Sequence, residues 1–159
     1  MKADGTGAKD SPALPEEASL LLDDQMCFAL YAAQRAMTNR YRPLLEEFNL
    51  TYPQYLVMLV LWEHGALSIK DLGKHLQLDY GTLTPLLKRL QTHGLVRRER
   101  RPADERSVQI SLTEEGAELR ERARVIPAII GKTTGLTAAE VAQVKVLVER
   151  LTANVTASQ

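Results

Sequence analysis

Five arginines lie between positions 97 and 106, in a stretch that also carries acidic residues. Arginine keeps its positive charge and presents a planar fork of N–H donors that fits phosphate oxygens and base edges. Such a stretch could grip a DNA duplex, with Arg106 entering a minor groove while Asp104 orients its guanidinium. The same charges could instead pair with one another on a solvated hairpin, the ordinary fate of a charged run. The arginines are Arg97, Arg98, Arg100, Arg101 and Arg106.

A second candidate for chemistry is Cys27, the only cysteine of the chain. It lies near the expected start of a helix, where the helix dipole favours the thiolate, the reactive form of the side chain. A free cysteine is also commonly a small buried hydrophobic residue, and its neighbours Met26, Phe28 and Ala29 fit that role as well. One cysteine excludes a disulfide within the chain and a zinc site built from several thiolates.

The histidines His64, His75 and His93 have no spacing that would bring two of them to one metal ion, and no acidic cluster joins them. We therefore interpret them as histidines at helix ends or on the surface. No arrangement of Ser, His and Asp indicates nucleophilic catalysis. We therefore expect no metal, no cofactor and no enzymatic activity.

The elements that must position these residues follow from the spacing of apolar side chains. Apolar residues recur at three- and four-residue intervals from about 20 to 48, which predicts an amphipathic helix, broken or kinked at Pro43. The run from Thr51 to Gln54 is a capping box that opens a second helix. Ser68 then caps a short helix that ends near Leu76.

The next helix ends at Gly94, directs its leucines inward and has a polar outer face. Its start has two candidates. Asp79 as cap would place Pro85 inside the helix at the cost of a backbone hydrogen bond, whereas Thr82 as cap would place it in the first turn. After a short capped helix, this element occupies the place of a DNA recognition helix, although an ordinary surface helix shows the same pattern. Off the leucine stripe lie Tyr80, Thr82, Thr84, Lys88, Arg89 and Gln91.

Residues 95–101 and 107–112 alternate like two strands, with residues 102–105 as the hairpin tip. Thr113 caps a helix to about Ile130, and a second capping box at Thr137 opens the last helix, which has valines on one side. A helix pair followed by a hairpin is a winged helix-turn-helix. The predicted fold is mainly α with a small β-hairpin (α+β).

The chain divides into a disordered tail (1–18), an N-terminal helical region (19–50), a winged helix-turn-helix (51–112) and C-terminal helices (113–159). The apolar stripes of the outer helices need a partner, and a second copy of the chain is the simplest one. We therefore expect a homodimer whose outer helices form the dimer interface.

The composition sets limits on partners and location. Lys and Arg number 20, as do Asp and Glu, so a basic face would have to be local. No apolar run is long enough to span a membrane, and the N-terminus lacks the apolar core of a signal peptide, so a cytoplasmic protein is expected.

Three runs of residues, 22–31, 79–90 and 104–113 before Gly116, resemble the MarR family of dimeric winged-helix repressors, and most closely its organic-hydroperoxide sensors. The resemblance implies a repressor that binds double-stranded operator DNA. The residues then expected to contact DNA are Tyr80, Gly81, Thr82, Thr84, Pro85, Lys88, Arg89, Arg98, Asp104 and Arg106.

The resemblance also assigns a role to Cys27, because family members carry a peroxide-sensing cysteine at this place. Tyrosines that match Tyr41 and Tyr52 hydrogen-bond its sulfur across the dimer, and one that matches Tyr31 lies nearby. Phenol donors stabilise the thiolate, which attacks the peroxide. An apolar pocket around it would favour organic hydroperoxides.

Two features depart from the family pattern. Tyr80 replaces a small serine, so the base preference is expected to differ. No second cysteine is present, so oxidised Cys27 needs a low-molecular-weight thiol or a backbone nitrogen to complete the switch. One alternative is a repressor released by a phenolic or aromatic ligand, with Cys27 inert. Another, from a different class, is a thiol peroxidase that uses Cys27.

Overall fold

The computed structural model describes residues 19–101 and 104–158, but not the side chains of residues 100–107. The tail predicted to be disordered, 1–18, and the centre of the predicted hairpin tip therefore lie outside the described residues. The chain divides into two compact units, with the boundary between Arg35 and Ala36.

The first unit contains a short 3-10 helix, Leu22–Asp24, and the beginning of α1, Met26–Glu46. The helix predicted from about residue 20 thus begins at Met26, after a turn that the side-chain amide of Gln25 holds by donating to the carbonyls of Ser19 and Leu21. Pro43 does not end α1, which continues to Glu46. A proline this close to the end of a helix removes one backbone hydrogen bond, and only the last few residues of the helix follow it.

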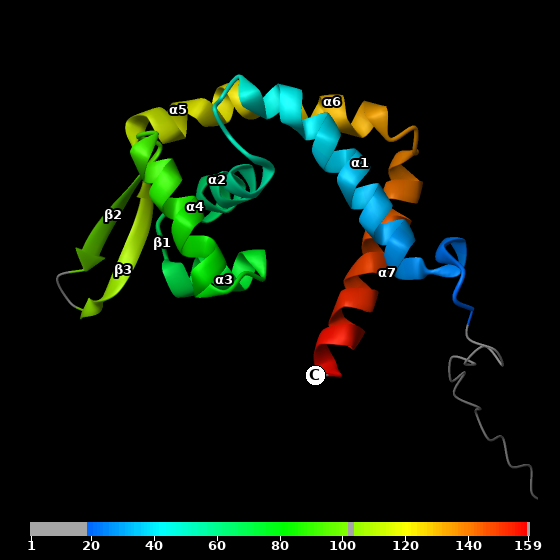
Figure 1. Cartoon of the computed structure of the whole chain (residues 1–159). Helices are drawn as coiled ribbons and strands as arrows, with labels where there is room; N and C mark the ends of the chain where they lie inside the picture. The colour runs from blue at the N-terminus through cyan, green and yellow to red at the C-terminus, as the bar shows by residue number, and fades with distance from the viewer. Residues whose placement is uncertain (1–18, 102–103, 159) are drawn as a thin grey trace, which may run out of the picture. The chain divides into compact units, whose positions relative to one another are not determined.

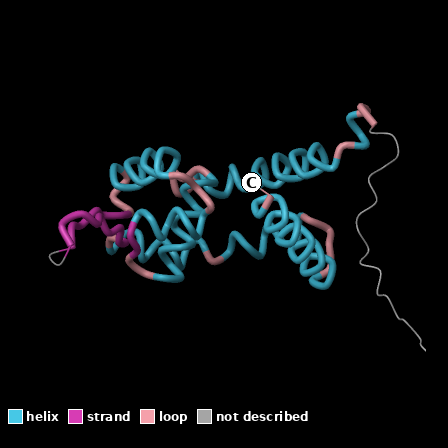
Figure 2. Tube along the Cα trace, turned by 90° about the horizontal axis from the view of Figure 1, so that it is seen from below, coloured by secondary structure: helices cyan, strands magenta, loops and turns pink. Residues whose placement is uncertain are grey.

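The second unit contains a small antiparallel sheet with strand order β1-β3-β2, and helices make up the rest of its regular structure. Figure 2 shows that the strands are confined to one region, and Figure 1 labels the elements. In chain order they are the end of α1, α2 (Tyr52–His64), β1 (Leu67–Ser68), α3 (Ile69–Leu76), α4 (Tyr80–Thr92), β2 (Val96–Arg101), β3 (Asp104–Leu112), α5 (Glu114–Ala123), α6 (Val125–Thr133) and α7 (Ala138–Ala157).

The predicted starts of α2, α3 and α7 are confirmed by their caps. Thr51 and Gln54 form a capping box at α2, as Thr137 and Glu140 do at α7. The Ser68 side chain accepts a hydrogen bond from the amide of Asp71 at the start of α3. These side chains satisfy backbone N–H groups that have no partner within the helix.

Two further predicted bounds were wrong, and one strand was missed. The helix after Thr113 is not continuous to Ile130: α5 ends at Ala123 and α6 begins at Val125. The reason is Pro127, which has no N–H to donate to the carbonyl four residues earlier. β3 begins at Asp104 rather than at residue 107, and β1 was not predicted at all.

The core of the second unit lies beneath α4 and the sheet. Leu83, Leu87 and Leu90 of α4 are buried, as predicted, and they meet Val96 of β2 and Ile110 of β3 in one apolar cluster. Burying side chains of this size contributes about 1.5–3 kcal/mol each. The core therefore fixes the position of α4, the expected recognition helix, relative to the hairpin of β2 and β3.

Candidate DNA interface and sensor residues

The structure decides where α4 begins. The carboxylate of Asp79 accepts hydrogen bonds of 2.8 Å from both the amide and the hydroxyl of Thr82, so Asp79 is the cap and Pro85 lies inside the helix. These bonds lower the pKa of Asp79, the amide contributing most. Figure 1 shows α4 followed directly by the hairpin of β2 and β3.

The predicted DNA-binding residues of α4 gather on the side opposite its buried leucines. All but one of them are exposed, and Tyr80 is 66% exposed. The exception is Thr84, which is half-buried and donates a 2.8 Å hydrogen bond to the carbonyl of Tyr80. The exposed residues are Tyr80, Gly81, Thr82, Pro85, Lys88 and Arg89.

The hydroxyl protons of Thr82 and Thr84 are both engaged within the protein. Toward a DNA groove these threonines offer acceptor lone pairs and methyl groups. A methyl group packs against the methyl of thymine, and a lone pair accepts from the amino group of adenine or cytosine. This face can therefore read bases without leaving a hydroxyl proton unpaired.

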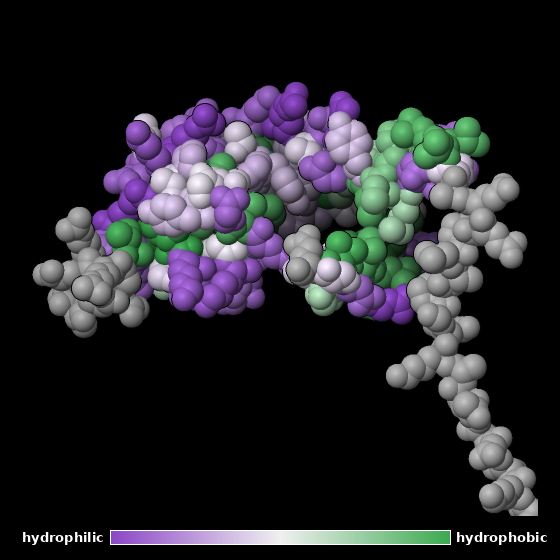
Figure 3. All heavy atoms as spheres, turned by 60° about the horizontal axis from the view of Figure 1, so that its bottom comes forward, coloured by the Kyte–Doolittle hydropathy of each residue, from purple (hydrophilic) through white to green (hydrophobic). Residues whose placement is uncertain are grey.

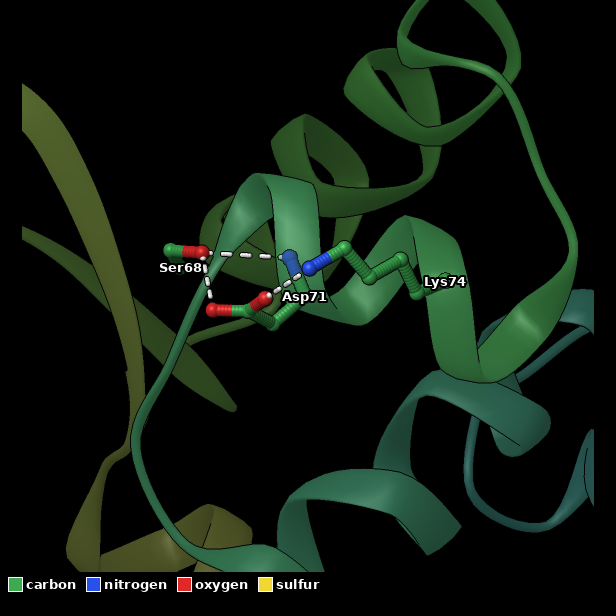
Figure 4. A network of polar contacts seen from close by, with 3 residues as sticks. All are labelled: Ser68, Asp71 and Lys74. Carbon is green, nitrogen blue, oxygen red and sulfur yellow. Dashed lines mark hydrogen bonds and ion pairs between the residues drawn. The ribbon is translucent and has the colours of Figure 1, made fainter.

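A cavity of about 550 Å³ lies beside this face, between α3, the first turns of α4, and β3. Tyr80, Lys70 and Lys74 are among its lining residues. Figure 4 shows how the start of α3 is ordered: Asp71 accepts from the hydroxyl of Ser68 at 2.7 Å and from Lys74 at 3.0 Å. Hydrogen bonds from Ser68 and then from Lys74 lower the pKa of Asp71.

The two faces of the hairpin carry different arginines. Arg97 lies on the solvent face, where its Nε contacts Glu99 at 2.8 Å and donates to Ser111 at 3.0 Å. Arg98 points to the other face and pairs in register with the buried Ile110. Asp104 pairs in the backbone with Arg101.

The side chains of Asp104 and Arg106, the predicted minor-groove pair, lie outside the described residues. Their roles therefore remain predictions.

The candidate sensor Cys27 is the second residue of α1 and is exposed. It does not take the place of a buried hydrophobic residue within this chain. Tyr31 stands one turn further along α1, where its hydroxyl accepts from Arg35 at 3.2 Å and the guanidinium lies 5.5 Å from the ring centre.

Tyr41 and Tyr52, from α1 and α2 of the second unit, are in contact, with ring centres 4.7 Å apart. Tyr55 extends the cluster, 5.9 Å from Tyr41, and was missed because the family resemblance pointed only to the other two. Burial raises the pKa of Tyr41, with Tyr52 adding to the effect. Burial, then Tyr41 and Tyr52, raises the pKa of Tyr55 to about 12. The phenols of Tyr41 and Tyr55 therefore stay protonated and can act as hydrogen-bond donors at neutral pH.

Within residues 19–101 and 104–158, no group of three or more His, Cys, Asp or Glu side chains could hold a metal ion. His64 and His75 do meet, with stacked rings 4.3 Å apart. Stacked rings cannot direct their lone pairs to a common ion. In the same described part, no helix is long and apolar enough to cross a membrane.

Comparison with known proteins decides the family. A family model described as transcriptional regulator SarA/Rot matches residues 39–122. The organic hydroperoxide resistance transcriptional regulator of Bacillus subtilis is 57% identical over 109 residues, which cover 69% of this chain and 74% of that protein. The chain belongs to the winged-helix MarR/SarA family of transcriptional regulators.

Solved structures of MarR/SarA regulators share this fold. Reduced AbfR bound to DNA is 37% identical, has a TM-score of 0.72, and covers 85% of this chain and 92% of its own. The PcaV regulator of Streptomyces coelicolor with its natural ligand is 27% identical, with a TM-score of 0.77, and covers 86% of this chain and 97% of its own. This MarR/SarA regulator is therefore a DNA-binding transcriptional regulator with a winged helix, as the sequence predicted.

Sequence reasoning missed two lysines of the regulator that lie beside its recognition helix. Lys70 and Lys74 line the same cavity as Tyr80. Their spacing of four residues on the polar side of α3 was the available signal, because residues four apart share one face of a helix.

Proposed function

We propose that this regulator is a homodimeric repressor that leaves operator DNA when an organic hydroperoxide oxidises Cys27. The observation that carries the proposal is Cys27 itself, the only thiol, exposed in the first turn of α1. The chain around it is similar to a regulator of organic hydroperoxide resistance. AbfR, the relative solved on DNA, has also been solved in overoxidised and disulfide forms.

The chemistry is a two-electron oxidation of sulfur. The thiolate of Cys27 attacks one peroxide oxygen, the O–O bond breaks, and the leaving alkoxide takes a proton to become an alcohol. The product is a sulfenic acid, which condenses with a low-molecular-weight thiol to give a mixed disulfide and water. With one cysteine per chain, no second thiol of the same chain can complete this step.

The family resemblance assigns Tyr41 and Tyr52 to the sulfur of the partner's cysteine. Their rings already contact each other, so one thiolate could accept hydrogen bonds from both phenols. Such bonds to a charged acceptor are stronger than those between neutral groups, and they favour the reactive thiolate.

A homodimer explains the exposed apolar side chains of the outer helices. Figure 3 shows patches of apolar side chains, in green, open at the surface. Exposed apolar residues include Leu22, Met26 and Phe28 in the first unit and Val141, Val144 and Val148 on α7. Apolar patches of this extent mark interaction surfaces, and a second copy of the chain would cover them.

The test is a gel shift with the full-length protein and a duplex that the wild type selects in vitro. Cumene hydroperoxide should release the wild type, whereas C27S should bind equally well and stay bound. Mass spectrometry after peroxide treatment should show one thiol adduct on Cys27 when a small thiol is present and no such adduct without it. Release of C27S by peroxide would show that Cys27 is not the sensor. Repeated peroxide consumption per thiol would favour the thiol peroxidase instead of the sensor.

A second candidate is release by an anionic aromatic ligand. A cavity of about 590 Å³ between α2, α5 and α6 is lined by Trp62, Leu59, Arg120 and Arg124 among others, which would suit a ring with a carboxylate. PcaV was solved with its natural ligand. Salicylate should then raise the melting temperature of C27S and release it from DNA. Absence of both effects for a panel of aromatic acids would argue against this candidate.

A further inference from the structure

Three aromatic side chains of α2, Tyr52, Tyr55 and Trp62, form a row along the helix. Their spacings of three and seven residues bring them to one helix face. Tyr41 of α1 packs against the first two, with ring centres 4.7 Å from Tyr52 and 5.9 Å from Tyr55. The rings of Tyr55 and Trp62 meet edge to face, 6.2 Å apart and at 69°, an arrangement that aromatic pairs favour. The aromatic row therefore connects the two phenols assigned to the sensor with Trp62.

The far end of the aromatic row is tied to the base of the hairpin. The indole N–H of Trp62 donates a 2.8 Å hydrogen bond to the carbonyl of Gly116, in the first turn of α5. The amide of Gly116 donates to the hydroxyl of Thr113 at 3.0 Å, and that hydroxyl donates to the carbonyl of Gly94. The amide of Thr113 donates to the carbonyl of Leu95 at 3.1 Å. Gly94 and Leu95 join α4 to β2, so Trp62 links α2 to the junction of the expected recognition helix and the wing.

These contacts leave little room for independent movement. Tyr55 is 2% exposed, and a Cβ added at Gly116 would stand 2.0 Å from the carbonyl oxygen of Leu95. Closely packed groups transmit strain, and coupling between distant sites travels through packed side chains and hydrogen bonds. A displacement of the Tyr41 ring is therefore passed through Tyr55 to Trp62.

Oxidation of the sensor supplies such a displacement. In the reduced state of the proposed mechanism, the phenols of Tyr41 and Tyr52 donate to a negatively charged sulfur. In the mixed disulfide the sulfur of Cys27 is neutral, so the phenols lose their charged acceptor. The attached thiol also needs space beside the two rings. Both changes favour a new position of the rings.

We propose that Trp62 is the coupling residue of the sensor: oxidation of Cys27 shifts the aromatic row, breaks the hydrogen bond to Gly116 and loosens the base of the hairpin. The inference rests on the proposed function, because it requires oxidation of Cys27 beside Tyr41 and Tyr52. It adds the route by which that event reaches the DNA-binding elements.

Trp62 is the only tryptophan of the chain, so intrinsic fluorescence reports on this position alone. The full-length protein is treated with one equivalent of cumene hydroperoxide and with free cysteine as the small thiol. The emission maximum should move to longer wavelength, because the indole N–H exchanges the carbonyl of Gly116 for water. C27S treated in the same way should not change, which excludes direct oxidation of the indole.

W62F tests the hydrogen bond itself, since it removes the indole N–H and keeps an aromatic ring against Tyr55. It should react with peroxide at the wild-type rate. The ratio of its operator Kd after oxidation to that before oxidation should be roughly fivefold smaller than the wild-type ratio. Q109M is the matched control, because it removes a side-chain donor to the carbonyl of Ala66, a 3.2 Å bond outside the aromatic row. It should keep the wild-type ratio.

The outcomes separate the coupling from the proposed function. An unchanged Trp62 emission in a wild type that carries the adduct and has left DNA would overturn the coupling alone and show that the winged helix moves as one body. A wild-type ratio in W62F, or an equal loss in Q109M, would overturn it as well. Release of C27S by peroxide, or a wild type that stays on DNA with the adduct in place, would reject the proposed function and the coupling together.

Discussion

The indole nitrogen of Trp62 donates a 2.8 Å hydrogen bond to the carbonyl oxygen of Gly116, joining α2 to the first turn of α5. Gly116 also lies against the carbonyl oxygen of Leu95, and an added Cβ would stand 2.0 Å from that oxygen. The amide of Thr113 donates to the same carbonyl at 3.1 Å. This contact holds the hairpin between α4 and α5 in place.

Gly116→Ala should therefore destabilise the protein by more than about 3 kcal/mol, since the clash is with backbone and cannot be relieved by a rotamer change. Trp62→Phe removes one hydrogen bond and should cost about 1 kcal/mol. Urea unfolding followed by circular dichroism measures both. Gly131→Ala is the control, because an added Cβ there meets no atom within 4 Å. Equal costs for the two glycine variants would contradict the packing argument.

Acid should weaken the start of the recognition helix through Asp79. Hydrogen bonds from Thr82 lower the pKa of this carboxyl in the folded state. Its contribution is therefore present above the unfolded pKa and is lost as the pH falls through the folded pKa. Asp79→Asn still caps the helix but does not titrate, so the wild type should lose more stability than the variant below about pH 4. Parallel stability curves for the two proteins would exclude this role.

Alkali should act through Tyr55, whose pKa is raised to about 12 by burial and by Tyr41 and Tyr52. A raised pKa means that the folded state holds the phenol proton more tightly, so this stabilisation is complete below about pH 10 and is lost as the pH rises toward 12. Absorbance titration should show a late-ionising tyrosine that is missing in Tyr55→Phe. A variant that keeps the late step would assign it elsewhere.

Tyr41→Phe and Tyr52→Phe should each slow the oxidation of Cys27 by roughly tenfold, because each removes a donor to the thiolate. Operator affinity should stay near the wild-type value. Tyr31→Phe serves as a comparison on the same helix as Cys27. Stopped-flow kinetics measure the rate at which Cys27 reacts with peroxide. An unchanged rate in both variants would show that the two phenols do not assist the oxidation.

For the wing pair Asp104 and Arg106, the expected change in operator affinity is opposite to the change that net charge alone predicts. Arg106→Ala should weaken operator binding by about 1–3 kcal/mol and reduce the salt slope by about one for each wing. Asp104→Ala should weaken binding too, although it removes a negative charge, because the sequence predicts that Asp104 orients the arginine. Fluorescence anisotropy across a salt series measures both. Tighter binding by Asp104→Ala would show a diffuse charge patch instead.

Local patterns in the sequence determined most of the helices. The capping boxes at Thr51 and Thr137 and the leucines of α4 involve residues within one or two turns, so their physics is complete at short range. The family resemblance followed from three other short runs, 22–31, 79–90 and 104–113. Cys27 stands out because no other cysteine is present, and its proposed sensor role comes from the family resemblance.

The folded structure decided the rest. Both Asp79 and Thr82 could cap α4, and only the folded chain places the carboxylate of Asp79 on the amide of Thr82. Two residues cannot mark β1 by pattern, because β1 exists only through its pairing with β3. Arg97 and Arg98 are alike in sequence, yet the strand register sends one to solvent and the other inward. Register is a property of two strands together, so no single segment of sequence contains it.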